Sequence, residues 1–270
     1  LSDSTIYMTL YTIQNLLREN KLKKENLSVE FFDFIYLGNG NIKEVAKKTK
    51  IKENLLKKIK ESFEYWMPMD HRHTFSLHLS NHLSFMIFAF AGLFPEKYWP
   101  KKISFHGLVV NEGSKMSKSK GNVITLLNVK ENYGADVFRF YMTGSTSIDG
   151  VFDWREVEAR NSKNTIERLY SQIEECIKDK KKGNLPKLYA SRFNRILKKS
   201  TEKIDSMNFR EYNLFVVYEI LNLVRDAKLG LKKEELFAFY DYIAPNWIKL
   251  ISPICPHIAE ELWSKLGKKN

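Results

Sequence analysis

Ile103-Ser-Phe-His-Gly-Leu-Val-Val-Asn-Glu-Gly-Ser-Lys-Met-Ser-Lys-Ser-Lys-Gly-Asn122 is the stretch of sequence that decides the fold. Its first eight residues are rich in β-branched and aromatic side chains, so they predict a strand or hairpin with a turn at residues 111–113. A glycine-flanked run of lysines and serines follows and predicts a mobile loop. Upstream, residues 81–94 predict a helix that Pro95 ends. Short strands mixed with helices in this way are typical of an α/β layered fold.

The rest of the chain divides by its hydrophobic pattern. Residues 20–60 are rich in Lys and Glu and predict a helical insertion on the surface. After residue 153, apolar residues recur every three or four positions, which predicts helices almost exclusively. We therefore predict an α/β part over residues 1–153, followed by an all-α bundle of four or five helices over residues 154–270.

The charge of the chain points to a polyanionic partner. Lys and Arg number 44 against 32 Asp and Glu, which gives a net charge of +12. Basic residues are densest between residues 178 and 203. A solvated surface is the alternative explanation for such a run, but in this chain we favour contact with an RNA backbone. The candidates for that contact are Lys181, Lys182, Arg192, Arg195 and Lys199.

The cysteines and the apolar runs bear on the cellular compartment. Cys176 and Cys255 lie in apolar patterns, so we expect buried thiols in a reducing cytoplasm rather than a disulfide. The most apolar run, residues 83–93, is far shorter than the roughly 20 residues of a membrane span, so it predicts a core helix and no membrane partner. The chain starts at Leu1 without an initiator Met, which indicates a piece of a longer or processed protein.

Lys115 and Lys118 carry the chemistry of the loop. Two lysines three residues apart among small hydroxyl residues allow a loop to close two ammonium groups over a polyphosphate. This suits attack on an α-phosphorus with pyrophosphate leaving, because negative charge grows on the oxygens that the donors meet. Losing one such donor typically costs about 3–4 kcal/mol of barrier. On composition alone, a solvated surface loop is the alternative.

The pentapeptide Lys115-Met-Ser-Lys-Ser119 is identical to the signature loop of the class I aminoacyl-tRNA synthetases. Residues 133–139, 152–154 and 252–263 resemble segments of the branch of that family that handles leucine, isoleucine, valine and methionine. The resemblance implies a partial Rossmann-type parallel sheet followed by a helical bundle of the anticodon-binding type. It makes Lys115 and Lys118 the catalytic residues. It also implies that ATP, with Mg²⁺ bound through the nucleotide, contacts Lys115, Met116, Ser117, Lys118, Ser119 and Gly121.

Structural roles suffice for several charged residues in these segments. Arg139 is expected to pair with Asp136 or Asp153. His257 is expected to be a packed or capping histidine rather than a catalytic one.

A cluster of histidines at positions 71, 73, 78 and 82 has a spacing that a metal site could use. No Cys is nearby, and no Glu lies between His78 and His82, as a metalloprotease helix would require. We therefore predict no protein-bound metal.

The amino-terminal part resembles leucyl-tRNA synthetases of the archaeal and eukaryotic type, through residues 1–8, 31–38, 70–73 and 81–83. Residues 74–80 depart from that pattern, because the family usually has Gly-Lys-Asp there. The resemblance implies a pocket for the leucyl-adenylate and the tRNA 3′ end, formed by Ser2, Asp3, Asn81 and His82.

The second signature of the class, His-Ile-Gly-His, does not occur in the 270 residues, and neither does the editing insertion. Leucine enzymes rely on editing because a hydrophobic pocket distinguishes one methylene by only about 1–3 kcal/mol. We expect the chain to need an N-terminal half that carries both, in the same chain or as a separate subunit. The complete enzyme would convert leucine and ATP to leucyl-adenylate and pyrophosphate, then charge tRNA(Leu). The alternatives are a non-catalytic RNA-binding relic, or a sister enzyme for methionine, valine or isoleucine.

Overall fold

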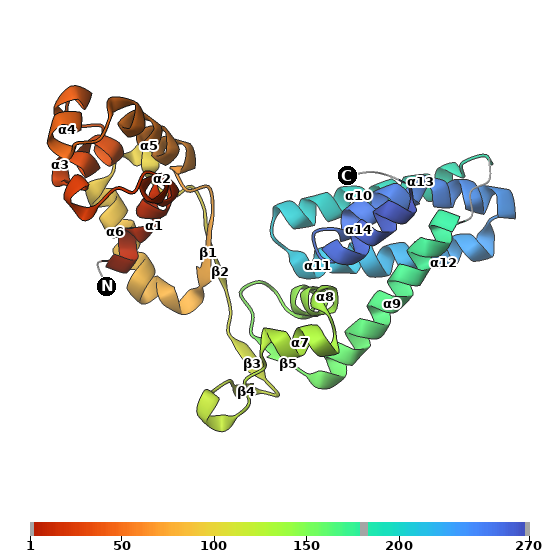
Figure 1. Ribbon diagram of the computed structural model, residues 1–270. Coiled ribbons are helices and arrows are strands. Elements are labelled where there is room, and N and C mark those ends of the chain that lie inside the picture. Colours follow the sequence, from red (N-terminus) through yellow and green to blue (C-terminus); the bar gives the residue numbers. More distant parts are fainter. Residues whose placement is uncertain (1–2, 179–182, 268–270) are drawn as a thin grey trace. The chain divides into compact units, whose positions relative to one another are not determined.

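The computed structural model describes residues 3–178 and 183–267, with side chains from residue 5 onward (Figure 1). The chain forms two compact units, which we call unit 1 (Leu1–His106) and unit 2 (Gly107–Asn270). Among the described residues, no helix has both the length and the apolarity needed to cross a membrane. Each unit is built around its own hydrophobic core.

Unit 1 begins with a cluster of helices over the segment that includes the predicted insertion. Helix α5 shows why they pack, because Leu56, Ile59 and Phe63 recur at helical spacing and are fully buried. Phe31 and Ile35 meet them from the neighbouring turns. The elements are α1 (Asp3–Tyr11), α2 (Gln14–Glu19), η1 (Lys24–Asn26), α3 (Val29–Phe32), η2 (Asp33–Leu37), α4 (Ile42–Thr49) and α5 (Glu53–Trp66).

The second half of unit 1 is a β–helix–β crossover. Strand β1 pairs in parallel with β2, so that Arg72 lies opposite Ile103 and Phe75 opposite His106. Parallel strands require a crossover connection, which helix α6 supplies before Pro95. The elements are β1 (Arg72–Phe75), η3 (Ser76–His78), η4 (Leu79–Leu83), α6 (Ser84–Leu93), η5 (Glu96–Tyr98) and β2 (Ile103–His106).

Unit 2 opens with a small mixed sheet that carries the lysine–serine loop. Strand β3 pairs in parallel with β5 and antiparallel with β4. The predicted turn is present, and both of its central residues, Glu112 and Gly113, have positive φ, as tight hairpins require. The elements are β3 (Val109–Asn111), β4 (Ser114–Lys115), η6 (Lys118–Lys120), α7 (Leu126–Asn132), α8 (Ala135–Ser145) and β5 (Phe152–Trp154).

The remainder of unit 2 is helical, which confirms the predicted fold class of small parallel sheets followed by a helical region. Its core surrounds the fully buried Trp247. The indole N–H of Trp247 donates to the carbonyl of Val216 (2.7 Å), which lies in a π-helical turn. The elements are α9 (Glu156–Lys178), α10 (Lys187–Asp205), α11 (Phe209–Asn213), η7 (Leu214–Glu219), α12 (Ile220–Gly230), α13 (Lys233–Ile251) and α14 (Pro256–Lys265).

The compact units do not divide at the predicted domain limit of 153/154. Val137 and Phe140 of α8 belong to the same core as the bundle, so residues 107–153 pack with it. Unit 2 starts at Gly107, where a Cβ would lie 1.8 Å from the Gly150 carbonyl oxygen, so only glycine fits. The helical pattern begins at 153/154. The domain limit placed there remains a prediction.

Candidate functional site

The lysine–serine loop is held in shape by Asn122, a residue to which the sequence alone assigned no role. Its side-chain oxygen accepts from the backbone N–H of Ser117 (2.8 Å), and its side-chain nitrogen donates to the carbonyl of Lys115 (3.2 Å). Its own carbonyl accepts from the side chain of Asn111 (3.0 Å) on β3. The loop is therefore closed on itself and tied to the sheet. Gly121, at φ +66°, ends the turn η6.

The base of the loop is fixed by Asp153 on β5. One carboxylate oxygen accepts from the backbone N–H of Gly113 (2.9 Å), and the other pairs with Arg155 (2.8 Å). The hydrogen bond from Gly113 and then the guanidinium of Arg155 hold the pKa of Asp153 below its usual value. The carboxylate is thus a charged anchor for the turn that precedes the loop.

The lysines of the loop point their charge outward. Lys115, Lys118 and Lys120 are all exposed, and no carboxylate in the described ranges forms an ion pair with any of them. The hydroxyls of Ser117 and Ser119 hydrogen-bond each other (2.8 Å) beside them. Unpaired ammonium groups with adjacent hydroxyl donors can gather around a polyphosphate without first breaking an existing contact.

Asn81 and His82 lie in unit 1, at the π-helical turn η4 before α6. The Asn81 side chain is turned back onto the helix, where its nitrogen donates to the Leu77 carbonyl (3.2 Å) and its oxygen accepts from the His82 N–H. The Nε2 of His82 lies 2.9 Å from a guanidinium nitrogen of Arg72, so Nε2 is the acceptor. Burial, the charge of Arg72 and His78 lower the pKa of His82, which favours the neutral ring.

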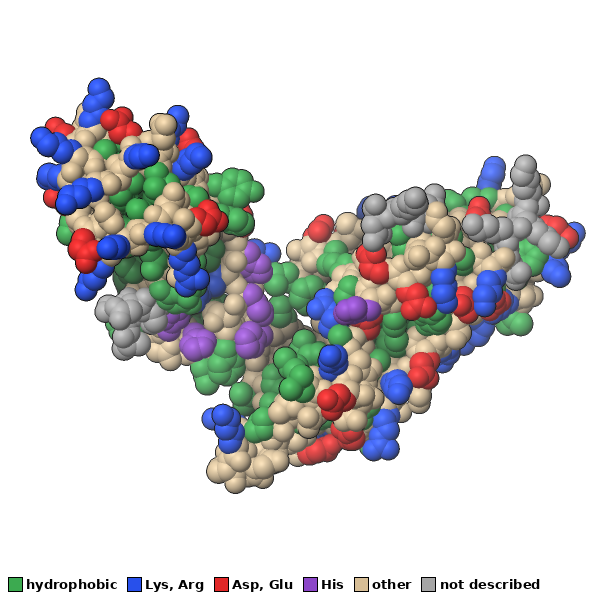
Figure 2. Space-filling model, viewed as in Figure 1, with side chains coloured by type: hydrophobic (Ala, Val, Ile, Leu, Met, Phe, Trp, Pro, Cys, Tyr) green, Lys and Arg blue, Asp and Glu red, His purple; other side chains and the backbone are tan. Residues whose placement is uncertain are grey.

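The histidines of unit 1 gather along one side of it (purple in Figure 2). His71 Nε2 and His73 Nδ1 both hydrogen-bond the hydroxyl of Ser104, at 2.6 and 2.8 Å. Burial, His106 and His71 lower the pKa of His73. The sequence reasoning missed His106, which joins this group through the parallel register of β1 and β2. Among residues 3–178 and 183–267, no three His, Cys, Asp or Glu side chains form a group that could hold a metal.

Three of the five predicted RNA-contacting residues come together on α10. Arg192, Arg195 and Lys199 line a cavity of about 230 Å³ whose opposite wall includes Phe215 and Glu219 of η7. They are not equivalent, because Arg192 already pairs with Asp226 (3.0 Å) and lies over the ring of Tyr189. The other two predicted positions, Lys181 and Lys182, lie outside the described residues, as does Ser2 of the predicted pocket, and the side chain of Asp3 is not described.

Comparison with known protein families gives two matches that together span most of the chain. The family described as "tRNA synthetases class I (M)" matches residues 47–177. The family described as "Anticodon-binding domain of tRNA ligase" matches residues 187–270. The first match includes the lysine–serine loop, and the second covers α10 to α14.

Individual relatives are similar along the whole chain. The leucine–tRNA ligase of Staphylothermus marinus is 39% identical over 274 residues, which cover 100% of this chain and 28% of that protein. That of Pyrococcus horikoshii is 38% identical over 282 residues, with 99% and 29% covered. The resemblance predicted from the sequence is therefore confirmed, and the chain spans less than a third of the length of these relatives.

A solved structure has a similar fold. It is the ternary complex of Agrobacterium radiobacter K84 agnB2 LeuRS with tRNA and LeuAMS, which superimposes with a TM-score of 0.64 at 19% sequence identity. The match covers 85% of this chain and 31% of that one. At 19% identity, the match is evidence of a similar fold only.

Proposed function

We propose that this chain, which is similar to leucine–tRNA ligases along its whole length, forms the part of such an enzyme that closes over ATP and supports the tRNA. The observation that carries the proposal is the Lys115–Ser119 loop, held in shape by Asn122 with its lysines unpaired among the described residues. The reaction would join leucine to the α-phosphate of ATP and release pyrophosphate. Leucine would then pass to tRNA(Leu).

The loop would act on the transition state of activation. When the leucine carboxylate attacks the α-phosphorus, negative charge grows on the phosphoryl oxygens and on the departing pyrophosphate. Lys115 and Lys118 would meet that charge, with the hydroxyls of Ser117 and Ser119 and the backbone of Met116 and Gly121 around the phosphates. Mg²⁺ would arrive bound to the nucleotide as part of the substrate. Donors placed in advance contribute most to such a step, because nothing has to reorganise as it occurs.

Unit 1 would supply one side of the adenylate pocket and of the site for the tRNA 3′ end. Asn81 and His82 are the described candidates, with Ser2 and Asp3 beside them by resemblance. The contact with Arg72 supports a neutral His82, because only an unprotonated Nε2 can accept from the guanidinium. A neutral ring is compatible with an apolar pocket for leucine, where an imidazolium would cost desolvation energy.

The bundle would contact the tRNA backbone through α10. Arg195 and Lys199 line a cavity of about 230 Å³, which is large enough for a phosphate group, and form no ion pair among the described side chains. A net charge of +12 supports an RNA partner. The free thiols of Cys176 and Cys255 are buried, and burial raises the pKa of both to about 12, which fits an unreactive role in the cytoplasm.

An N-terminal half with the His-Ile-Gly-His signature and the editing domain would complete the enzyme. Two features support it besides the 28% coverage of the relatives. Helix α6 exposes large apolar side chains, with Phe85 53% and Phe88 76% exposed. The sheet of β1 and β2 has only two strands among the described residues, too few to be stable alone.

Leucine-dependent exchange between ATP and pyrophosphate tests the proposal. We expect no exchange with the 270-residue chain alone and exchange after it is mixed with an N-terminal half that carries His-Ile-Gly-His. Methionine, valine and isoleucine serve as the comparison, and a preference for one of them would assign a sister enzyme. A verified complex that exchanges with none of the four amino acids would leave the RNA-binding relic, which the altered residues 74–80 favour.

A further inference from the structure

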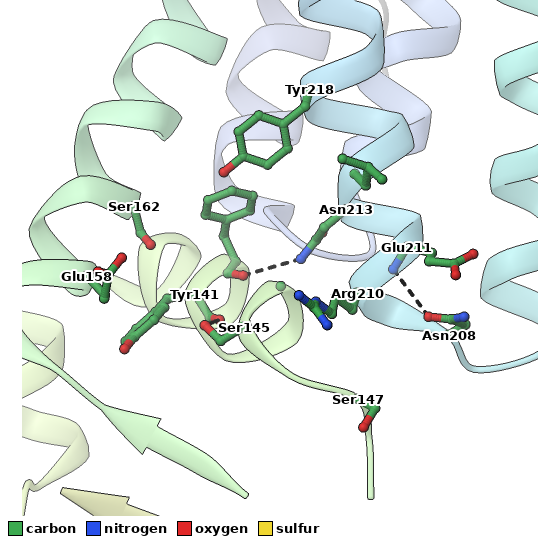
Figure 3. Close-up of a pocket in the computed structure, with 13 residues that line it drawn as sticks. Tyr141, Ser145, Ser147, Glu158, Ser162, Asn208, Arg210, Glu211, Asn213 and Tyr218 are labelled. Atoms are coloured by element: carbon green, nitrogen blue, oxygen red, sulfur yellow. Dashed lines mark hydrogen bonds between the residues drawn. The ribbon is translucent and has the colours of Figure 1, made fainter. Parts of the chain in front are cut away.

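A cavity of about 670 Å³ in unit 2 belongs to none of the sites above. It lies between the end of α8, the start of α9 and the segment α11–η7 (Figure 3). Its size is in the range of small-molecule and nucleotide pockets. Its walls combine aromatic rings with hydroxyls, one arginine and two carboxylates.

Asn213 is a buried polar residue in the wall of the cavity. The residue is 1% exposed, and its side-chain nitrogen donates to Thr143 Oγ1 (2.9 Å) and to the Phe140 carbonyl (3.3 Å; dashed in Figure 3). Its side-chain oxygen has no hydrogen-bond partner among the described residues. Gly144 permits this close packing, because a Cβ there would lie 3.0 Å from the Asn213 nitrogen.

The charged side chains of Arg210 and Glu158 lie on different sides of the cavity. Arg210 is exposed and forms no ion pair among residues 3–178 and 183–267, while Glu158 projects from α9 on the other side (Figure 3). The second carboxylate, Glu211, is neutralised by an ion pair with Lys203, which lowers its pKa. Arg210 and Glu158 therefore line the same cavity, and neither forms an ion pair in the part of the chain that the structure describes.

An aromatic wall lies between these charges. Tyr218 is 39% exposed, and its ring lies 6.3 Å from that of the buried Phe140, so part of the Tyr218 ring is accessible. A guanidinium for a phosphate, a ring for a base and a carboxylate for sugar hydroxyls or an exocyclic amine match the three parts of a nucleotide. A polyphosphate fits poorly, because there is only one unpaired cation.

We propose that this cavity takes one nucleotide of the RNA partner, with its base against Tyr218 and its phosphate on Arg210. The proposal rests on the proposed function, which supplies the RNA. The π-helical turn η7 contributes residues to both this cavity and the basic cavity on α10. Leu214 and Tyr218 line the first, and Phe215 and Glu219 line the second, so the two cavities occupy different sides of one short helical segment.

Equilibrium binding of the 270-residue chain to a tRNA(Leu) transcript, over a series of salt concentrations, tests the assignment. We expect Tyr218→Ala to weaken binding about tenfold, while Tyr218→Phe keeps the ring and stays within about twofold. Arg210→Ala should reduce the slope of log affinity against log salt by about 1, as the loss of one phosphate contact does. Arg168→Ala, an exposed arginine on α9 that lines neither cavity, is the matched control.

The outcomes separate this inference from the function on which it rests. Wild-type chain that fails to bind the transcript would refute the RNA partner and this cavity assignment together. Wild-type binding that Tyr218→Ala leaves unchanged would refute the cavity alone. AMP that binds the chain without RNA and loses its affinity in Tyr218→Ala, while that substitution leaves tRNA binding unchanged, would assign the cavity to a free nucleotide and overturn the RNA assignment. Tyr218→Leu, which keeps an apolar side chain, and thermal unfolding of every variant distinguish lost stacking from lost folding.

Discussion

The ring Nδ1 of His257 donates a hydrogen bond to the carboxylate of Asp136 across 2.9 Å, although the two residues are 121 positions apart. Asp136 is buried on α8 and also accepts the backbone N–H of Ile258 (2.8 Å), at the start of α14. Arg139, one turn along α8, donates to the carbonyls of Pro253 (2.6 Å) and Ile254 (2.9 Å). Helix α8 therefore hydrogen-bonds both to the corner between α13 and α14 and to the start of α14.

Asp136→Ala is expected to lower the free energy of unfolding of the chain by about 2 kcal/mol, because it removes the carboxylate that caps α14 and leaves the partly buried N–H groups of His257 and Ile258 without this acceptor. Urea unfolding followed by circular dichroism measures the change. Asp136→Asn keeps one acceptor oxygen and should cost less. His257→Ala, whose side chain is 76% exposed, should cost least; an equal loss in all three would contradict the capping role.

Lys118→Ala is expected to reduce the rate of ATP–pyrophosphate exchange by about 10²–10³-fold in the complex with the N-terminal half, since it removes a donor to the transition state. Lys120→Ala is the matched control, because Lys120 is an exposed lysine of the same loop outside the predicted catalytic pair. A similar loss in both variants would mean that only the total charge of the loop matters.

Asn122→Ala should loosen the loop without unfolding unit 2. It removes the two hydrogen bonds that tie the Asn122 side chain to the backbone of Lys115 and of Ser117, yet the loop contributes nothing to the core. We expect the KM for ATP to rise about tenfold while the thermal midpoint of the chain changes little. Asn128→Ala, an exposed asparagine on α7, is the comparison. An unchanged KM would show that substrate alone orders the loop.

The three basic residues on α10 are expected to contribute unequally to RNA binding. Arg195→Ala and Lys199→Ala should each reduce the salt slope of tRNA binding by about 1, since each removes one cation that has no ion pair among the described side chains. Arg192→Ala should reduce it less, because that guanidinium is already paired with Asp226. Fluorescence titrations from low to moderate salt measure the slopes. A larger change in slope for Arg192→Ala than for the other two variants would point to RNA displacing Asp226 from Arg192.

The titration of His82 has a definite direction. Its pKa is lowered by burial, Arg72 and His78, so the unfolded chain, in which a histidine has a pKa of about 6.5, binds the proton more tightly. Stability is therefore greatest above pH 6.5 and falls as the pH drops through the lowered pKa. Ring resonances in NMR spectra should titrate below pH 6.5, and Arg72→Gln should move the midpoint upward. A midpoint above 6.5 in the wild-type chain would exclude the neutral acceptor role.

The sequence predicted the elements that depend on local pattern. The hairpin around residues 112–113, the helix before Pro95 and the helical bundle all follow from periodicity and turn chemistry, and all are present. Contacts between distant residues could not be obtained that way. Arg139 was expected to pair with Asp136 or Asp153, which are near in sequence, but it binds backbone carbonyls of the α13–α14 corner instead. His257 was expected to be a packed or capping histidine, but its side chain is 76% exposed and donates to Asp136, and it is Asp136 that accepts the backbone N–H of Ile258 at the start of α14.

In the candidate site, too, the sequence predicted local features but not the contacts between distant residues. The signature residues of the loop were identified by their order along the chain, but the roles of Asn122 and Asp153 depend on hydrogen bonds that no spacing rule predicts. His106 joined the histidine group only through the parallel register of β1 and β2. The large cavity near Tyr218 was not predicted, because it forms where three separate helical segments meet.

The two-stranded pairing of β1 and β2 also has a consequence for solvent access to the backbone. Among the described residues, the outer edges of both strands have no strand beside them, so their amide protons should exchange readily with deuterated water in the 270-residue chain. An N-terminal half that extends this sheet would slow the exchange of those protons, while the amides of α13, packed in the separate core of unit 2, would keep their rate. The rate of hydrogen–deuterium exchange at β1 and β2 would thus report binding of an N-terminal half, independently of any substrate.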